Sequence, residues 1–149
     1  MADHTLNYTL DQLESAVTVV KDQMTRAQVI TFTGDLGAGK TTLIRALLKD
    51  LGVTQPITSP TFTYVNRYIT ASGKTLYHFD LYRLNTLEEF MAQGFDEYLY
   101  QPNSWCLIEW PAIVMPLLTH AVCHITLDYD GDSRIMHWSF DTGVPPRSW

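Results

Sequence analysis

One glycine-rich turn constrains the fold of this chain more than any other stretch of its sequence. The pattern G-x-x-x-x-G-K-[ST], which marks phosphate-binding loops, is matched at its defining positions by Gly34, Gly39, Lys40 and Thr41. Residues 28–33, directly before this turn, are rich in β-branched side chains, as a buried strand is. Leucine and isoleucine recur at helical spacing through residues 43–51, directly after it. A strand that passes through such a turn into a helix predicts an α/β fold with a phosphate-binding loop.

The residue types in this turn suit the binding of a nucleoside triphosphate. Glycines let the backbone turn tightly and bring successive N–H groups to phosphate oxygens. The positive end of the following helix adds to that attraction. We expect the Lys40 ammonium to reach the β- and γ-phosphates and the Thr41 hydroxyl to ligate Mg²⁺. The alternative is an ordinary turn with a surface lysine, but the strand before it and the helix after it favour a nucleotide-binding protein.

Length and composition indicate one compact domain. The chain has 149 residues, of which 46% are hydrophobic, and this is enough to build a core. We predict a single domain over residues 1–149, with a frayed tail at residues 142–149. The sequence has no apolar run of about 18 residues and no charged segment ahead of an apolar one, so we expect a cytoplasmic protein that does not contact a membrane. Cys106 and Cys123 are isolated, which argues against disulfides and zinc and predicts small apolar core residues.

The charge of the chain argues against direct binding of nucleic acid. The formal net charge is −6, and the ten Lys and Arg residues are scattered along the sequence. Proteins that grip a phosphate backbone usually display a basic face. We therefore expect any link to RNA or DNA to run through another protein.

The rest of the chain predicts further helices and two hairpins. Thr9 and Gln12 form a capping box ahead of an amphipathic helix, and Thr86 with Glu89 opens a short one. Strand-like runs pair around turns at residues 64–69 with 75–80, and at residues 121–129 with 134–140. Hairpins add antiparallel pairs to the parallel strands expected around a phosphate loop. The predicted fold is a three-layer α/β sandwich like that of P-loop NTPases, with a mixed, partly antiparallel central sheet.

Two acidic residues could complete a magnesium site. A phosphate loop works with Mg²⁺, which needs a carboxylate, and ligands of open α/β sheets lie at the carboxyl ends of the strands. Asp80 and Glu109 each close a strand-like run, and the apolar run before Glu109 is the stronger signal. Position alone does not rank them for ligating the metal or positioning water. The alternative is that either acid faces solvent at a strand end.

Other residues near these motifs have open interpretations. Thr61, in a hydroxyl-rich segment with a proline, could sense the γ-phosphate or belong to an ordinary proline turn. Trp110 could be a lid, a partner surface or a core residue. His78 is interpreted as a packed or hydrogen-bonded neighbour of Asp80, because the histidines lack a third ligand at zinc-like spacing.

Four blocks together resemble a known family. They are Gly34–Thr42, Ser59–Thr63, Tyr77–Leu84 and Cys106–Pro111, in the family's order and spacing. The sequence resembles the TsaE family, formerly called YjeE, bacterial ATPases of threonylcarbamoyladenosine tRNA modification. The resemblance implies a P-loop ATPase that hydrolyses ATP with Mg²⁺ and joins the TsaB and TsaD proteins. Those partners transfer the threonylcarbamoyl group to adenosine 37 of tRNAs that read codons beginning with A, and ATP turnover supports repeated cycles of transfer.

The resemblance also implies roles for particular residues. Lys40, Asp80 and Glu109 would be catalytic, with Asp80 facing the nucleotide, and Thr41 and Glu109 would ligate Mg²⁺. Trp110 would sit beside the site. The phosphates would be held by Gly37, Ala38, Gly39, Lys40, Thr41 and Thr42. On the adenine side, Leu10 and Arg134 are the nearest equivalents of the family's residues, although no motif secures either.

Two other functions remain open on the sequence alone. A small-molecule kinase would also begin with a phosphate loop, but it would need an acceptor pocket and an arginine-rich lid that the sequence does not display. A nucleotide-dependent interaction module would bind ATP without hydrolysing it. For the leading hypothesis, no arginine finger is evident in the chain, so turnover is expected to be slow until a partner completes the site.

Overall fold

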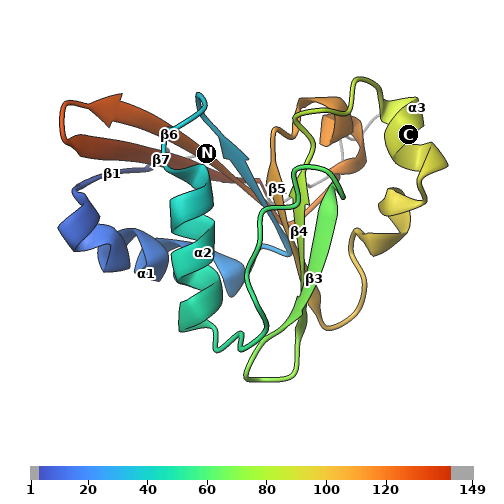
Figure 1. Cartoon of the computed structure of the whole chain (residues 1–149), viewed down its shortest axis with the longest axis horizontal. Coiled ribbons are helices and arrows are strands. Elements are labelled where there is room, and N and C mark those ends of the chain that lie inside the picture. The colour runs from blue at the N-terminus through green and yellow to red at the C-terminus, as the bar shows by residue number, and fades with distance from the viewer. Residues whose placement is uncertain (1–3, 142–149) are drawn as a thin grey trace.

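The computed structural model describes residues 4–141, so the frayed tail predicted at 142–149 lies outside the described residues. Its centre is one seven-stranded sheet with the order β1-β7-β6-β2-β5-β4-β3 (Figure 1). The strands are β1 (His4–Tyr8), β2 (Val29–Thr33), β3 (Val65–Ile69), β4 (Thr75–Asp80), β5 (Ser104–Glu109), β6 (Val122–Asp130) and β7 (Ser133–Asp141). The α-helices are α1 (Leu13–Met24), α2 (Lys40–Asp50) and α3 (Leu87–Ala92), and the short 3₁₀ helices are η1 (Leu10–Gln12), η2 (Phe95–Tyr98) and η3 (Ala112–Leu117).

The sheet is mixed, as the hairpins predicted. β2 lies between β5 and β6 and runs parallel to both, and β4 continues the parallel set beyond β5. The pairs β3–β4, β6–β7 and β1–β7 are antiparallel. Because β2, β4 and β5 run the same way, their carboxyl ends meet at one edge of the sheet, where Asp80 lies in register with Glu109.

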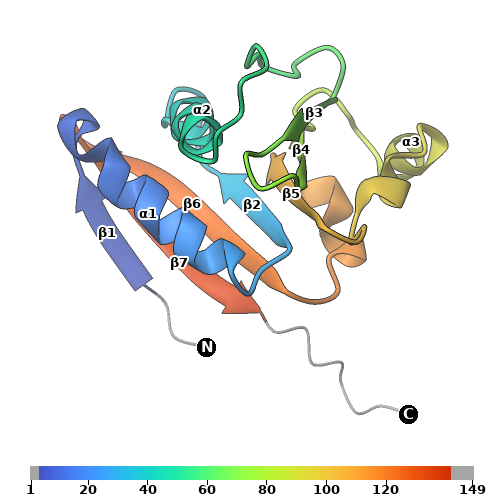
Figure 2. The same ribbon diagram turned by 90° about the horizontal axis from the view of Figure 1, so that it is seen from below.

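Helical segments cover both faces of the sheet, which confirms the sandwich. Helices α1 and α2 lie on one face (Figure 2), where their apolar residues pack on Ile30 and Phe32 of β2. The opposite face carries α3, η2 and η3 over a second core that includes Val29 and Ile108. Neighbouring residues of β2 therefore serve different cores, as the alternation of side chains along a strand requires. Both cysteines are buried, as predicted for small apolar core residues.

The sequence analysis missed the first strand. β1 pairs antiparallel with β7, so the two strands come from opposite ends of the chain. A strand of five residues gives too short a sequence pattern to reveal that pairing. The capping box at Thr9 and Gln12 exists, but it opens η1, and α1 begins only at Leu13. Thr86 is the N-cap of α3, since the Glu89 N–H donates to the Thr86 hydroxyl oxygen over 3.1 Å, which is one of the two hydrogen bonds of the predicted box. Within residues 4–141 we find no helix with the length and apolar character needed to cross a bilayer.

Candidate functional site

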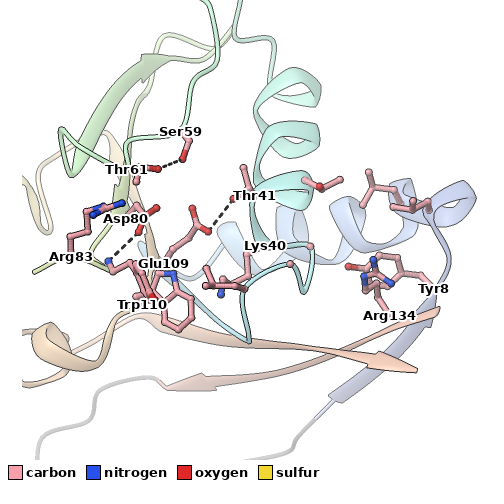
Figure 3. Close-up of a pocket in the computed structure, with 17 residues that line it drawn as sticks. Tyr8, Lys40, Thr41, Ser59, Thr61, Asp80, Arg83, Glu109, Trp110 and Arg134 are labelled. Carbon is pink, nitrogen blue, oxygen red and sulfur yellow. Dashed lines mark hydrogen bonds between the residues drawn. The ribbon is translucent and has the colours of Figure 1, made fainter. Parts of the chain in front are cut away.

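A cavity of about 590 Å³ opens at the edge of the sheet where α2 begins (Figure 3). It gathers residues from the phosphate-loop motif, the ends of β4 and β5, the Ser59–Thr61 segment and the β1–η1 and β7 elements. Its lining residues are Tyr8, Leu10, Leu13, Leu36, Gly37, Gly39, Lys40, Thr41, Thr42, Ser59, Thr61, Asp80, Tyr82, Arg83, Glu109, Trp110 and Arg134. Segments far apart in sequence thus converge on one concave surface, which is typical of a ligand site.

The phosphate-loop motif forms a tight turn between β2 and α2. Gly39 caps α2 with φ of 100°, a left-handed conformation that side chains other than glycine rarely adopt. At Gly34, a Cβ atom would lie 2.5 Å from the carbonyl oxygen of Leu127 in β6. The glycine at this position therefore allows the loop to press directly against the neighbouring strand. Ala38 is buried and is not among the residues that line the cavity.

Lys40 is held inward in this structure. Its side chain is only 5% exposed, and its ammonium donates to the carbonyl oxygens of Gly34 and, over 3.4 Å, of Asp35. The Trp110 ring lies under the ammonium, with Nζ 3.7 Å from the ring centroid. Burial lowers the pKa of Lys40, and the nearby Glu109, Asp80 and Asp35 carboxylates oppose that shift. These contacts hold the cation beside the loop, and within residues 4–141 it forms no ion pair.

Glu109 is not a solvent-facing strand-end acid. It is 2% exposed, and its two carboxylate oxygens have different partners. Oε1 accepts from the Thr41 hydroxyl over 3.4 Å, and Oε2 lies 2.7 Å from Nε2 of His78. The hydrogen bond of His78 therefore goes to Glu109, which corrects the hydrogen-bonded alternative for Asp80, although His78 is close enough to Asp80 to oppose the rise in pKa that burial causes there. The structure brings Thr41 and Glu109 together as a magnesium site would require.

Asp80 lies beside Glu109 but in different surroundings. It is half-buried, and its Oδ1 accepts from the backbone N–H of Tyr82 over 3.1 Å. Burial raises the pKa of Asp80, and the neighbouring Glu109 carboxylate adds to the rise. The Tyr82 N–H, His78 and Lys40 oppose it. Both strand-end acids line the cavity, but they differ in their contacts, because Glu109 reaches Thr41 and Asp80 accepts from the Tyr82 N–H (Figure 3).

Thr61 and Trp110 both border the cavity. The Thr61 hydroxyl is 2.9 Å from that of Ser59, within the segment that forms the cavity's upper wall in Figure 3. Trp110 is half-buried, with a left-handed φ of 58° directly after β5. Its ring packs between Lys40 and Tyr82, whose ring centroid is 4.9 Å away. Trp110 is therefore a wall of the cavity rather than a member of either core.

The opposite end of the cavity contains Leu10 and Arg134, as Figure 3 shows for the arginine. Leu10 is 61% exposed. The Arg134 guanidinium lies over the Tyr129 ring, 4.3 Å from its centroid, and the buried Nε has no hydrogen-bond partner among the described residues. Tyr8 is buried here, and burial raises its pKa while Arg134 opposes the shift. Leu10 and Arg134, for which the sequence offered no motif, thus line the same cavity as Gly39.

Comparison with known proteins decides the family. A family model described as "Threonylcarbamoyl adenosine biosynthesis protein TsaE" matches residues 8–136. The chain belongs to the TsaE family. It is similar to the tRNA threonylcarbamoyladenosine biosynthesis protein TsaE of Haemophilus influenzae, with 43% identity over 109 residues, 73% of this chain and 68% of that protein. The Rickettsia conorii protein of the same name is 36% identical over 134 residues, 89% of this chain and 74% of its own length.

A solved structure agrees with this assignment. The crystal structure of Bacillus subtilis YdiB matches with a TM-score of 0.68 and 26% identity, over 96% of this chain and 89% of that one. The resemblance inferred from the four sequence blocks is therefore confirmed, and so is the P-loop NTPase-like α/β fold. Membership in the TsaE family also supports nucleotide binding as the chemistry of the cavity.

The donor set fits a magnesium ion. Within residues 4–141 no group of three or more His, Cys, Asp or Glu side chains gathers in a metal cage. Mg²⁺ is usually bound by one or two protein oxygens, with phosphate oxygens and waters completing its shell. The Thr41 hydroxyl and the Glu109 carboxylate could supply such oxygens, since both residues line the cavity and their oxygens are 3.4 Å apart.

The sequence analysis missed several residues of the TsaE-family cavity. Tyr8 could not be found without β1, while Tyr82 and Arg83 lie just after Asp80 in a block already recognised. Their cavity position depends on the turn that follows β4. For His78 the sequence contained only part of the signal. Residues two apart on a strand share a face, which groups His78 with Asp80, but the register that brings Glu109 beside them is seen only in the folded sheet.

Proposed function

We propose that this chain is the Mg²⁺-dependent ATPase of bacterial threonylcarbamoyladenosine biosynthesis, acting with TsaB and TsaD. The observation that carries the proposal is the convergence of Lys40, Thr41 and Glu109 at the mouth of the phosphate-loop turn, inside a cavity of about 590 Å³. The family match and the names of its relatives supply the biological process.

The phosphate-loop residues would bind and orient the triphosphate. Backbone N–H groups of Gly37, Ala38, Gly39, Lys40, Thr41 and Thr42, together with the start of α2, would face the phosphate oxygens. The Lys40 ammonium would exchange the Gly34 and Asp35 carbonyls for the β- and γ-phosphates. This exchange is favourable because each neutral acceptor is replaced by an anionic one.

Thr41 and Glu109 would hold Mg²⁺ against the same phosphates. When bound, the ion neutralises charge that develops on the β- and γ-phosphate oxygens. Asp80 would orient the attacking water and accept its proton, as the water oxygen bonds to the γ-phosphorus and the bond to the β–γ bridging oxygen breaks. Burial raises the pKa of Asp80, which favours proton acceptance. Thr61 would contact the γ-phosphate, and Trp110 would form one side of the site. At the other end of the cavity, Leu10 and Arg134 would border the adenine.

Turnover is proposed to be slow without partners. Two arginines line the cavity, but both rest on aromatic rings. The Arg83 guanidinium is 4.9 Å from the Phe62 ring centroid, and that of Arg134 is 4.3 Å from the Tyr129 centroid. An arginine that adds to the role of Lys40 in the transition state would therefore have to leave its ring or come from a partner. We also infer a single cytoplasmic domain that meets tRNA only through its partners, consistent with the net charge of −6.

Two measurements on the full chain test the proposal. Calorimetry should detect ATP and ADP binding in the presence of Mg²⁺, and phosphate release from ATP should accelerate when TsaB and TsaD are added together. Absence of nucleotide binding would overturn the proposal at its base. Binding without phosphate release would indicate an interaction module, and a phosphorylated metabolite in place of free phosphate would indicate a kinase.

A further inference from the structure

His78 is a buried histidine whose only side-chain hydrogen bond in the described residues is to Glu109. Both side chains lie almost wholly inside the protein, at 2% exposure each. Nε2 of the ring is 2.7 Å from Oε2 of the carboxylate, while Nδ1 is buried without a partner among residues 4–141. Leaving a buried nitrogen unpaired is unfavourable. The orientation of the ring therefore satisfies the hydrogen bond to Glu109 and leaves Nδ1 unpaired.

The contact with His78 gives the two oxygens of the Glu109 carboxylate different partners. Oε2 is occupied by His78, so Oε1 is the oxygen turned to the Thr41 hydroxyl and the cavity. A glutamate side chain has three rotatable bonds, and a carboxylate free at both oxygens would not keep one orientation. With the ring proton on Nε2, His78 donates to Oε2 and limits the rotation of the carboxylate.

We propose that His78 is a positioning residue that orients Glu109 for Mg²⁺, an inference that rests on the proposed function. His78 touches neither the nucleotide cavity nor Thr41, so it acts only through Glu109. Its position follows from β4 and β5, in which Asp80 lies in register with Glu109 and His78 is two residues earlier on the same face. Outer partners that orient a metal ligand in this way typically change metal affinity 10–100-fold when they are removed.

The test compares nucleotide affinity with and without magnesium. His78→Leu removes the donor and keeps an apolar side chain, while His78→Gln can place an amide N–H where Nε2 stood. His124→Leu is the matched control, because His124 also lies on the sheet and bonds a threonine, Thr31, over 2.8 Å, but it does not line the cavity. Calorimetry gives the ATP dissociation constant for each variant in Mg²⁺ and in a chelator. The measured quantity is the constant in chelator divided by the constant in Mg²⁺, which states how much Mg²⁺ strengthens binding.

We expect that ratio to fall about tenfold or more in His78→Leu, to stay within about threefold of the native value in His78→Gln, and to be unchanged in His124→Leu. A folded His78→Leu variant with the native ratio overturns the inference. Should the leucine variant fail to fold, His78→Asn replaces it, because its shorter amide cannot reach Oε2 and the same fall is expected. A native ratio in folded His78→Asn likewise overturns the inference.

Two further comparisons separate the possible failures. In a Glu109→Gln background, adding His78→Leu should change the ratio less than about threefold, because the two residues act as one unit. A full tenfold further fall would show that His78 does not act through Glu109. If native protein binds no ATP in either buffer, the proposed function fails, whereas native binding that strengthens with Mg²⁺ leaves only the role of His78 in question.

Discussion

The two ends of the cavity are built differently. The phosphate end consists of Lys40, Thr41, Asp80 and Glu109, and the hairpin end consists of Tyr8, Leu10 and Arg134. At the phosphate end, Lys40 and Glu109 are nearly buried, and each of the four residues has a hydrogen-bond partner. At the hairpin end, Leu10 is 61% exposed, and Arg134 rests on an aromatic ring.

This difference indicates how the two ends would treat a ligand. Charges in a buried, low-dielectric setting interact strongly but must be held in place, and the phosphate end holds them with backbone carbonyls and His78. The hairpin end offers an aliphatic surface and one cation, which can adapt to a flat ring without fixed geometry. We therefore expect substitutions at the phosphate end to alter catalysis and those at the hairpin end to alter affinity only modestly.

The largest effect is expected for Lys40→Ala. Removing the ammonium should reduce the rate of phosphate release about 100-fold or more, because Lys40 donates to carbonyls of the loop itself, whereas the cavity's two arginines rest on aromatic rings. Lys49→Ala is the matched control, since Lys49 is an exposed lysine of the same helix outside this cavity. Steady-state assays of both variants decide the matter, and near-native turnover of Lys40→Ala would remove the assigned role of the phosphate end.

The next effect concerns the rigidity of the phosphate end. Gly34→Ala would place a Cβ 2.5 Å from the Leu127 carbonyl oxygen, at a φ of 155°. We expect it to lower the free energy of unfolding by about 2–4 kcal/mol through overpacking and backbone strain. Gly73→Ala separates the two causes, because Gly73 has φ of 85° and a Cβ added there would meet no atom within 4 Å. It should lose only about 1 kcal/mol in denaturant unfolding, and equal losses would mean that the loop can move away from β6.

A smaller effect is expected at the hairpin end. Arg134→Met keeps the length of the side chain but removes the guanidinium, and we expect the ATP dissociation constant to rise about fivefold, or ~1 kcal/mol. The rise should be the same in Mg²⁺ and in a chelator, because Arg134 lies away from Thr41 and Glu109. Calorimetry of Arg134→Met beside Arg67→Met, an exposed arginine of β3, measures it. A change that depends on Mg²⁺ would mean that the two ends are coupled.

The contrast between the ends also explains what could be predicted from the sequence. The phosphate end is specified locally, since a strand, a glycine-rich turn and a helix follow one another within about 20 residues, and Asp80 and Glu109 each close a recognisable strand. The mixed sheet followed from its two hairpins. Local sequence does not encode the β1–β7 pairing, so Tyr8 was missed. The partner of His78 depended on strand register, which only the folded sheet fixes.

The smallest expected effect tests whether the phosphate end is arranged for chemistry at some expense in stability. Burial raises the pKa of Asp80 above its ordinary 3.8, so the folded protein binds this proton more tightly than the unfolded chain does. The ionised carboxylate therefore destabilises the fold once the pH exceeds 3.8, and the penalty is complete above the raised folded-state pKa. Asp80→Asn keeps an oxygen for the Tyr82 N–H and removes the charge. We expect its melting temperature to exceed that of the native protein at pH 7 and the gain to disappear as the pH falls below 3.8, while ATP hydrolysis is lost. Thermal unfolding at several pH values checks this, and a gain that grew as the pH fell would contradict the assigned cause.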